Sequence, residues 1–285
     1  MIAVERTIEI PGLTLAARVH GPDDGLPVLA LHGWTDNAAT FDRLAPLLPG
    51  LRIVALDLAG HGFSGRRVGA PYHFIDFVAD VAAAADALGW SEFSLLGHSL
   101  GAGVAALLAG TWPARVRRLA LLEGLGPMTE PDAGAPARLR EAVDAELAQA
   151  RRGGGSRPGY PDPQVVARRL AEAVQMQQGS AEILLARGLH EVSPGRWDWR
   201  ADGALRMPSR LRMTEAQVEA FLRAIACPTL LLRADPGMPV DAAYFARRLA
   251  WIADATRVER PGGHHVHLDD PETVAAVVGP FLLGA

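Results

Sequence analysis

The stretch that decides the fold is Phe93–Gly101, which reads FSLLGHSLG and contains the pattern G-x-S-x-G at Gly97, Ser99 and Gly101. An apolar run precedes the pattern and small residues follow it, which predicts a strand, a sharp turn and a helix. A serine at such a turn stands clear of the backbone, and the two glycines leave room for neighbouring chain segments. Amides at the start of the following helix can stabilise an oxyanion. The pattern therefore predicts that Ser99 is a nucleophile.

Short apolar runs alternate with helical segments on both sides of this turn. The alternation predicts an α/β protein with a doubly wound, mostly parallel sheet, because strands covered on both faces are apolar throughout. A hairpin is expected at the start, over Val4–Ile10 and Leu13–Val19. The other expected strands are Val28–Leu31, Ile53–Leu56, Phe93–Leu96, Leu119–Leu122, Thr229–Leu232 and Thr256–Glu259, and the expected helices are Ala79–Leu88, Ala102–Gly110 and Glu272–Leu283.

The alternation stops near residue 127. Residues 127–160 are rich in Ala, Arg, Gly and Pro, and Arg151–Pro158 is typical of an exposed loop. Helical periodicity returns at Val165–Gln177 and Ala181–Leu189, and a further helix is expected at Thr214–Ile225 with Thr214 as its N-cap. We therefore expect a helical cap over residues 127–213. It would interrupt a core domain formed by residues 1–126 and 214–285.

The composition and charge of the chain argue against two classes of binding partner. The 285 residues carry a net charge of −4 and show no basic stripe, so neither nucleic acid nor an anionic membrane is an expected partner. A small-molecule substrate is expected instead. The N-terminus lacks the basic start and apolar run of a signal peptide, and the single cysteine, Cys227, excludes an intrachain disulfide. These features predict a cytoplasmic protein in which Cys227 is a buried small side chain.

A general base is expected in the segment Pro261–Pro271, which contains three histidines in four positions. His264 follows two glycines directly after the last expected strand, and the chain order Ser then His suits this kind of fold. His265 and His267 are expected to pack or cap near the final helix. A metal site is the weaker alternative, because metal sites need further ligands in a defined geometry. The H-x-x-H spacing, with Asp269 and Asp270 nearby, keeps this alternative open.

Two carboxylates are candidates for the acid that would fix the tautomer of the histidine. Glu123 ends the apolar run Leu119–Leu122, and Asp235 follows Leu230–Leu232. Both lie where a parallel strand should end, at the edge of the sheet where ligands bind. The spacing alone does not choose between them.

Four landmarks together resemble the α/β-hydrolase family over nearly the whole chain. They are His32-Gly33-Trp34 after an apolar strand, the loop Asp57–Ser64 (DLAGHGFS), the turn Gly97–Gly101, and Gly263-His264 with Pro271 seven residues after the histidine. Within that family the chain resembles the serine hydrolase-like proteins, which share HGWTDN at His32–Asn37 and FDRL at Phe41–Leu44.

The chain also resembles the haloalkane dehalogenases at Leu122-Glu123-Gly124 and at Ala234–Gly237. That group carries an aspartate nucleophile where this chain has Ser99, which argues against dehalogenation and epoxide hydrolysis. The commoner hydrolase pattern places the acid at the position of Gly237, whereas many dehalogenases place it at the position of Glu123. The resemblance therefore favours Glu123 over Asp235.

The resemblance further implies an oxyanion hole formed by the backbone amides of Trp34 and Leu100. His32, Asp57, Gly60 and Gly62 would shape loops, and His61 is a minor candidate for reaching the site. The implied activity is hydrolysis of a carboxylic ester of a small apolar substrate through an acyl-enzyme, without a metal or an organic cofactor. Hydrolysis of a C–C, thioester or lactone bond uses the same residues, and a ligand-binding protein with little turnover is the alternative outside enzymes. The cap aromatics Tyr160, Trp197 and Trp199 would either line the pocket or pack within the cap.

Overall fold

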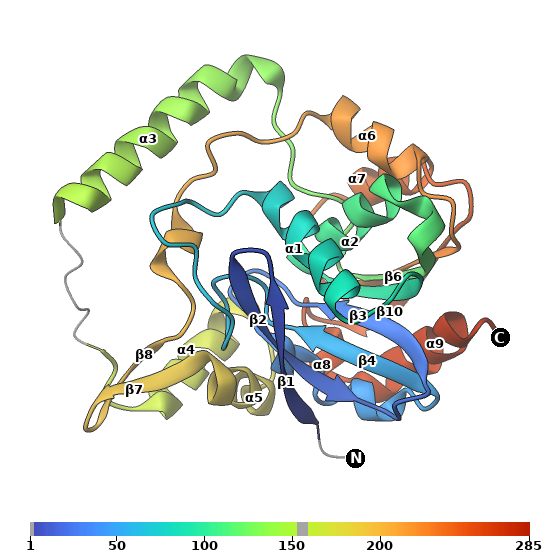
Figure 1. Cartoon of the computed structure of the whole chain (residues 1–285), viewed down its shortest axis with the longest axis horizontal. Helices are drawn as coiled ribbons and strands as arrows, with labels where there is room; N and C mark the ends of the chain where they lie inside the picture. Colours follow the sequence, from blue (N-terminus) through green and yellow to red (C-terminus); the bar gives the residue numbers. More distant parts are fainter. Residues whose placement is uncertain (1–2, 153–158) are drawn as a thin grey trace.

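The computed structural model describes residues 3–152 and 159–285. In the described part, an eight-stranded sheet runs through the molecule in the order β1-β2-β4-β3-β5-β6-β9-β10 (Figure 1). β1 and β2 form the predicted antiparallel hairpin, β2 pairs antiparallel with β4, and the remaining pairs are parallel. The doubly wound sheet predicted from the sequence is thus confirmed. Its strands are β1 (Val4–Ile10), β2 (Leu13–His20), β3 (Leu26–Leu31), β4 (Leu51–Leu56), β5 (Phe93–His98), β6 (Val116–Leu122), β9 (Thr229–Pro236) and β10 (Ala255–Gly262).

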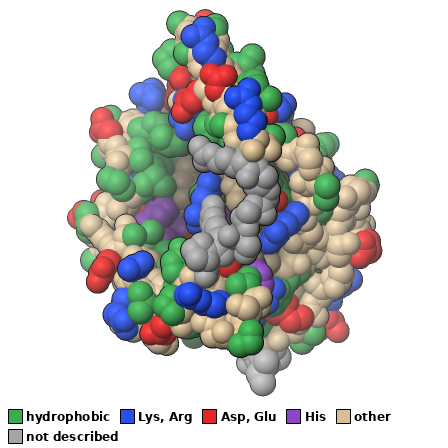
Figure 2. Space-filling model, turned by 90° about the vertical axis from the view of Figure 1, so that its left-hand side faces the viewer, with side chains coloured by type: hydrophobic (Ala, Val, Ile, Leu, Met, Phe, Trp, Pro, Cys, Tyr) green, Lys and Arg blue, Asp and Glu red, His purple; other side chains and the backbone are tan. Residues whose placement is uncertain are grey.

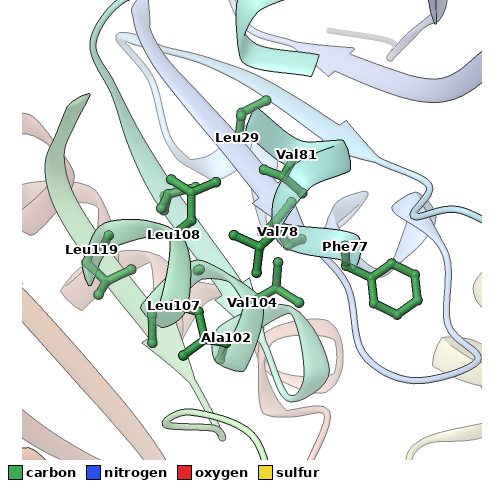
Figure 3. Close-up of a cluster of buried hydrophobic side chains, with 14 of the residues drawn as sticks. Leu29, Phe77, Val78, Val81, Ala102, Val104, Leu107, Leu108 and Leu119 are labelled. Carbon is green, nitrogen blue, oxygen red and sulfur yellow. The ribbon is translucent and has the colours of Figure 1, made fainter. Parts of the chain in front are cut away.

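Helices cover both faces of this sheet. On one face α1 and α2 pack on the central strands, and Figure 3 shows Val78 and Val81 of α1 beside Val104 and Leu108 of α2. On the other face α9 packs its buried apolar residues against the sheet. The core helices are α1 (Phe74–Ala87), α2 (Leu100–Thr111), α6 (Glu215–Arg223), α7 (Ala242–Leu249), α8 (Val266–Asp269) and α9 (Pro271–Leu283), with short 3₁₀ helices at Ala38–Phe41, Ala45–Leu47, Pro113–Arg115, Asp132–Gly134 and Gly203–Arg206.

The register of the parallel strands brings the candidate site residues to one edge of the sheet. Leu31 at the end of β3 pairs with Gly97, and His98 at the end of β5 pairs with Leu122 of β6. Leu122 in turn pairs with Leu232 of β9. The carboxyl ends of four neighbouring parallel strands therefore meet, and this is the edge at which open α/β sheets bind ligands.

The segment between β6 and α6 contains α3 (Ala135–Arg152), α4 (Pro163–Val174), α5 (Gln178–Gly188) and the hairpin of β7 (Leu189–Ser193) and β8 (Arg196–Trp199). Figure 1 shows α3 apart from the sheet at the upper left. It shows α4, α5 and the hairpin together at the lower left. α4, α5 and α6 follow the predicted helices, and Thr214 caps α6 as expected. The expected loop Arg151–Pro158 is wrong for Arg151 and Arg152, which continue α3, and its residues 153–158 lie outside the described residues.

A buried ion pair anchors this segment to the core. The guanidinium of Arg187 on α5, whose side chain is 2% exposed, lies 2.8 Å from the fully buried Asp57 carboxylate. It also donates to Glu5 at 2.6 Å and lies 4.3 Å above the ring of Phe63. A buried charge is tolerated when it is paired and hydrogen-bonded in this way. Asp57 therefore couples the loop after β4 to the inserted helices.

Replacing Arg187 by methionine is expected to lower the free energy of unfolding by about 3–5 kcal/mol, because Asp57 would keep a buried charge without its partner. The matched control is Arg200→Met, since Arg200 lies 4.6 Å from the same Phe63 ring without bonding to Asp57. Urea unfolding measures the free energy of unfolding of both variants and of wild type. Equal losses in both variants would contradict the anchoring role.

Within residues 3–152 and 159–285, no helix combines the length and the apolarity that crossing a bilayer requires. Cys227 is buried as expected, and burial raises the pKa of its thiol to about 11.

Candidate active site

Ser99 lies at the turn between β5 and α2 with φ 53° and ψ −113°, a backbone conformation that costs energy for any residue but glycine. The turn is fixed by two hydrogen bonds, from the amide of Ser99 to Leu122 at 3.0 Å and from that of Gly101 to His32 at 3.0 Å. A Cβ at Gly97 would lie 2.6 Å from the Gly101 carbonyl oxygen, and one at Gly101 would lie 2.1 Å from a backbone oxygen of β3. Both motif glycines are therefore required by close packing.

Glu123 lies at the end of β6 and is fully buried. Its Oε1 accepts a hydrogen bond from the amide of Ala234 at 2.7 Å and lies 3.0 Å from the Arg233 guanidinium. Its Oε2 accepts from the amide of Met238 at 2.6 Å and lies 3.3 Å from His264 Nδ1. Burial raises the pKa of this carboxyl, but the hydrogen bonds from His264 and the two amides, with the Arg233 charge, outweigh it and lower the pKa. Glu123 is therefore ionised and fixed beside His264.

The other candidate acid, Asp235, lies apart from this arrangement. It is exposed, and its backbone pairs with Pro261 at the end of β10. Gly237, the position of the acid in the commoner hydrolase pattern, has no room for a side chain. A Cβ there would lie 2.7 Å from Oε2 of Glu123 and 2.4 Å from a backbone oxygen. The structure thus brings Glu123, and not Asp235, to His264.

Two buried histidines support the loop after β3. His32 Nδ1 donates to the carbonyl of Gly33 at 2.7 Å, and its Nε2 accepts from a backbone amide at 3.0 Å. His61 Nδ1 donates to a carbonyl at 3.0 Å, and its Nε2 accepts from the amide of Thr35 at 3.3 Å. His61 is fully buried, so it supports the loop rather than facing substrate.

The predicted oxyanion donors lie on this loop and at the start of α2. The amides of Trp34 and Leu100 donate no hydrogen bond to any group in the described part of the chain. The first amides of a helix lack partners within the helix, which leaves Leu100 available to a ligand. The Trp34 side chain is 42% exposed and lines the cavity next to Ser99.

A cavity of about 1180 Å³ opens at Ser99. Its walls are mostly apolar, and four methionines contribute to them, with arginines and Glu141 among the charged lining residues. Figure 2 shows the side of the molecule that carries α3, where apolar side chains and arginines are interspersed. Tyr160, Trp197 and Trp199 pack around α4 and α5 instead of lining the cavity, which agrees with the packing alternative. The methionines are Met128, Met207, Met213 and Met238.

A second group of polar side chains lies behind the triad candidates. Asp36, His98 and His265 place their possible ligand atoms within 4.8 Å of one another, so they could hold a metal ion. Of the histidines and aspartates in the segment Pro261–Pro271, only His265 belongs to this group. Asp269 accepts a hydrogen bond from Gln177, and Asp270 caps α9.

No sequence pattern pointed to Asp36 or His98 as candidate site residues. Their only signal was proximity, since Asp36 is two residues after Trp34 and His98 directly precedes Ser99. His267, which was expected to pack, is fully buried in α8 and bonds Thr40 through Nε2 at 2.8 Å.

Burial of neutral histidines makes stability depend on pH. Burial lowers the pKa of His32 and of His98 to about 4 and that of His61 to about 3, and it lowers the pKa of His267 well below its usual value. The unfolded chain protonates near pH 6.5, so between pH 6.5 and 4 it binds protons that the folded chain does not. His265 has a raised pKa and is protonated in both states in this window.

Stability is therefore expected to fall as the pH is lowered from 6.5, by up to about 1.4 kcal/mol per pH unit for each of these histidines. Urea unfolding at pH 7, 6 and 5 measures the slope. His267→Gln is expected to reduce the slope of unfolding free energy against pH by about 1.4 kcal/mol per pH unit, because the unfolded variant binds one proton fewer. Stability that is constant or rises down to pH 5 would contradict the neutral burial of these histidines.

The doubly wound sheet with helices on both faces is that of the α/β hydrolases, and a family model for the alpha/beta hydrolase fold matches residues 27–158. A "Serine hydrolase-like protein" of Danio rerio is 33% identical over 98% of this chain and 88% of that protein. The chain therefore belongs to the α/β-hydrolase family and, within it, to the serine hydrolase-like proteins.

Other relatives agree with this assignment. "Lipase LipV" of Mycobacterium tuberculosis is 30% identical over 93% of this chain and 97% of that protein. The crystal structure of a hypothetical protein from Pseudomonas aeruginosa PAO1 superposes with a TM-score of 0.91, at 44% identity and with 98% of each chain covered.

Proposed function

We propose that this protein is a serine hydrolase in which Ser99 is the nucleophile, His264 the general base and Glu123 the acid that orients the base. The observation that carries the proposal is the 3.3 Å contact between His264 Nδ1 and Glu123 Oε2, at the edge where the backbone holds Ser99 in its strained turn. The backbone amides of Trp34 and Leu100 form the oxyanion hole.

The proposed steps follow from this geometry. The Glu123 carboxylate accepts a hydrogen bond from Nδ1–H of His264, so Nε2 carries the lone pair that takes the proton of Ser99. Ser99 then attacks a carbonyl, and the two amides stabilise the oxyanion by about 3–4 kcal/mol each. The protonated His264 gives its proton to the leaving group, and an acyl-enzyme remains. Water activated by His264 releases the acid and restores Ser99.

The cavity supports a carboxylic ester with an apolar acyl group as the substrate. Pockets for drug-sized ligands measure about 300–1,000 Å³, so a cavity of about 1180 Å³ favours a longer acyl chain than the small substrate expected from the sequence. Residues 127–213 supply part of its wall through Met128, Leu205, Met207 and Met213. We therefore assign this segment as a cap over a core formed by residues 1–126 and 214–285.

Release of p-nitrophenol from acetate, butyrate and octanoate esters tests the proposal. We expect turnover that increases from acetate toward the longer esters, because the longer chains bury more apolar surface in the cavity. Ser99→Ala supplies the background rate. Equal rates in wild type and Ser99→Ala with all three esters would contradict esterase activity. Acyl thioesters and lactones would then be tested, and saturable binding without product would indicate a ligand-binding protein.

A further inference from the structure

Two buried histidines, His98 and His265, and the partly buried Asp36 meet beside the proposed triad. The exposed fractions of the Asp36, His98 and His265 side chains are 11%, 1% and 6%. Each adjoins a group that the proposed reaction uses. His98 precedes Ser99, His265 follows His264, and Asp36 lies on the loop that carries the Trp34 amide.

One contact of this group reaches the His264 backbone, and a second attaches the neighbouring His265 to the oxyanion loop. His98 donates from Nε2 to the carbonyl oxygen of His264 at 2.9 Å. His265 Nε2 lies 3.0 Å from Oδ2 of Asp36, which attaches the next residue of the base loop to the oxyanion loop. The same Oδ2 lies 3.6 Å from His98 Nδ1. Segments separated by 166 and 229 positions in the chain are thereby fixed to one another.

The oxyanion loop also packs closely on this group. A Cβ at Gly33 would lie 3.0 Å from Oδ2 of Asp36 and 3.0 Å from Nδ1 of His98. Gly33 immediately precedes Trp34, so the position of the Trp34 amide depends on how Asp36 and His98 are placed. The two donors and the carboxylate therefore set the separation between the oxyanion loop and the nucleophile turn.

Opposite charges on Asp36 and His265 stabilise the contact between these two side chains. Burial raises the pKa of Asp36, but the charge and the hydrogen bond of His265 hold it well below its usual range. Burial lowers the pKa of His265, but Asp36 outweighs that effect and raises it. Asp36 and His265 thus form a buried ion pair. His98, whose pKa burial lowers to about 4, is neutral and keeps its proton on Nε2 for the His264 carbonyl. Its Nδ1 then carries no proton, so His98 packs beside Asp36 without a hydrogen bond to it, and the ion pair is that of Asp36 with His265.

We propose that Asp36, His98 and His265 form a positioning cluster, which holds the base loop, the nucleophile turn and the oxyanion loop in the register that catalysis requires. The inference rests on the proposed function, because it assigns these residues to the alignment of Ser99, His264 and the Trp34 amide. None of the three touches substrate in this scheme. Their effect is exerted through the backbone of the groups that do, where a displacement of about 1 Å can cost about 10²-fold in rate.

The test compares variants that delete or retain single contacts. Asp36→Ala and His265→Leu delete the ion pair, whereas His265→Gln keeps an N–H donor at the position of Nε2. Thr40→Val is the matched control, because it removes a buried hydrogen bond to His267, whose ring lies 4.2 Å from that of His98, and deletes none of the hydrogen bonds of the three cluster residues. The measurements are kcat and KM with the best p-nitrophenyl ester, the rate of Ser99 labelling by a fluorophosphonate, and Tm.

We expect Asp36→Ala and His265→Leu to lower both kcat and the labelling rate by about 30–100-fold, with KM changed by less than about threefold. His265→Gln is expected to recover most of the lost rate. Thr40→Val is expected to lower Tm to a similar extent and to leave kcat within about twofold of wild type.

Losses of kcat in Asp36→Ala and His265→Leu no larger than in Thr40→Val would overturn the positioning role. One equivalent of a divalent metal in the purified wild type, with kcat lost on chelation, would overturn it in favour of a metal site at the same atoms. Failure of the proposed function gives a different result. Wild type would then show neither ester turnover nor labelling at Ser99, and the positioning role would fall with it.

Discussion

Replacing Ser99 by alanine is expected to lower kcat for ester hydrolysis by about 10⁶-fold, which is the loss typical of removing a serine nucleophile. The substitution removes only Oγ, and the hydrogen bonds that fix the turn come from the backbone of Ser99 and Gly101. Alanine would therefore adopt the same strained conformation, and the cavity and the oxyanion amides would remain in place. The loss should appear in kcat, with little change in substrate binding.

The control for this variant is Ser94→Ala, because Ser94 lies on β5, the strand that leads into the Ser99 turn, is 5% exposed and does not line the cavity. Its activity should stay close to that of wild type. Stoichiometric fluorophosphonate labelling of wild type, and none in Ser99→Ala, would locate the reactive group independently of turnover. Activity of Ser99→Ala within 100-fold of wild type would require a different nucleophile.

The strands of the sheet were predictable because burial leaves a simple pattern in the sequence. β3, β4, β5, β6 and β9 each contain a buried run of mostly apolar residues, because this part of each strand is covered on both faces. α3 and the β7-β8 hairpin left no such pattern. Leu139 and Leu147 on α3 are about half exposed, and every residue of β8 is exposed or partly exposed. Elements that bury little surface cannot be recognised from hydrophobic periodicity.

Some residues of the candidate site were predictable from local sequence patterns, whereas others are brought together only by the folded chain. Ser99 and His264 belong to local patterns, a glycine-flanked turn and a histidine after a strand end. The preference for Glu123 rested on a resemblance, and its physical basis lies in the packed fold, where Gly237 has no space for a carboxylate. The contacts of Asp36 join segments that are distant in the sequence, and no local pattern predicts such pairs.

Replacing Glu123 by glutamine is expected to lower kcat/KM by about 10⁴-fold, as the loss of a triad carboxylate does. Glu123 accepts hydrogen bonds from the amides of Ala234 and Met238, and it also faces His264 Nδ1 and the Arg233 guanidinium. A glutamine offers one acceptor oxygen and one amino group, so the amino group must face at least one of these donors. The Arg233 charge favours the glutamine oxygen at the position of Oε1, where it also accepts from the Ala234 amide, so the amino group takes the position of Oε2 and faces His264 and the Met238 amide.

That arrangement would reverse the tautomer of the base. Nδ1 of His264 would accept a hydrogen bond and carry no proton, so Nε2 would be protonated and unable to take the proton of Ser99. The decisive comparison is Asp235→Asn, because Asp235 is exposed and its side chain lies outside the hydrogen-bond network of His264. We expect Asp235→Asn to retain near-normal kcat/KM with p-nitrophenyl butyrate. The reverse outcome would be near-normal kcat/KM in Glu123→Gln and a large loss of kcat/KM in Asp235→Asn. It would assign the acid to Asp235 on β9. Since both substitutions remove one negative charge near the same sheet edge, a difference between them isolates the carboxylate that orients His264.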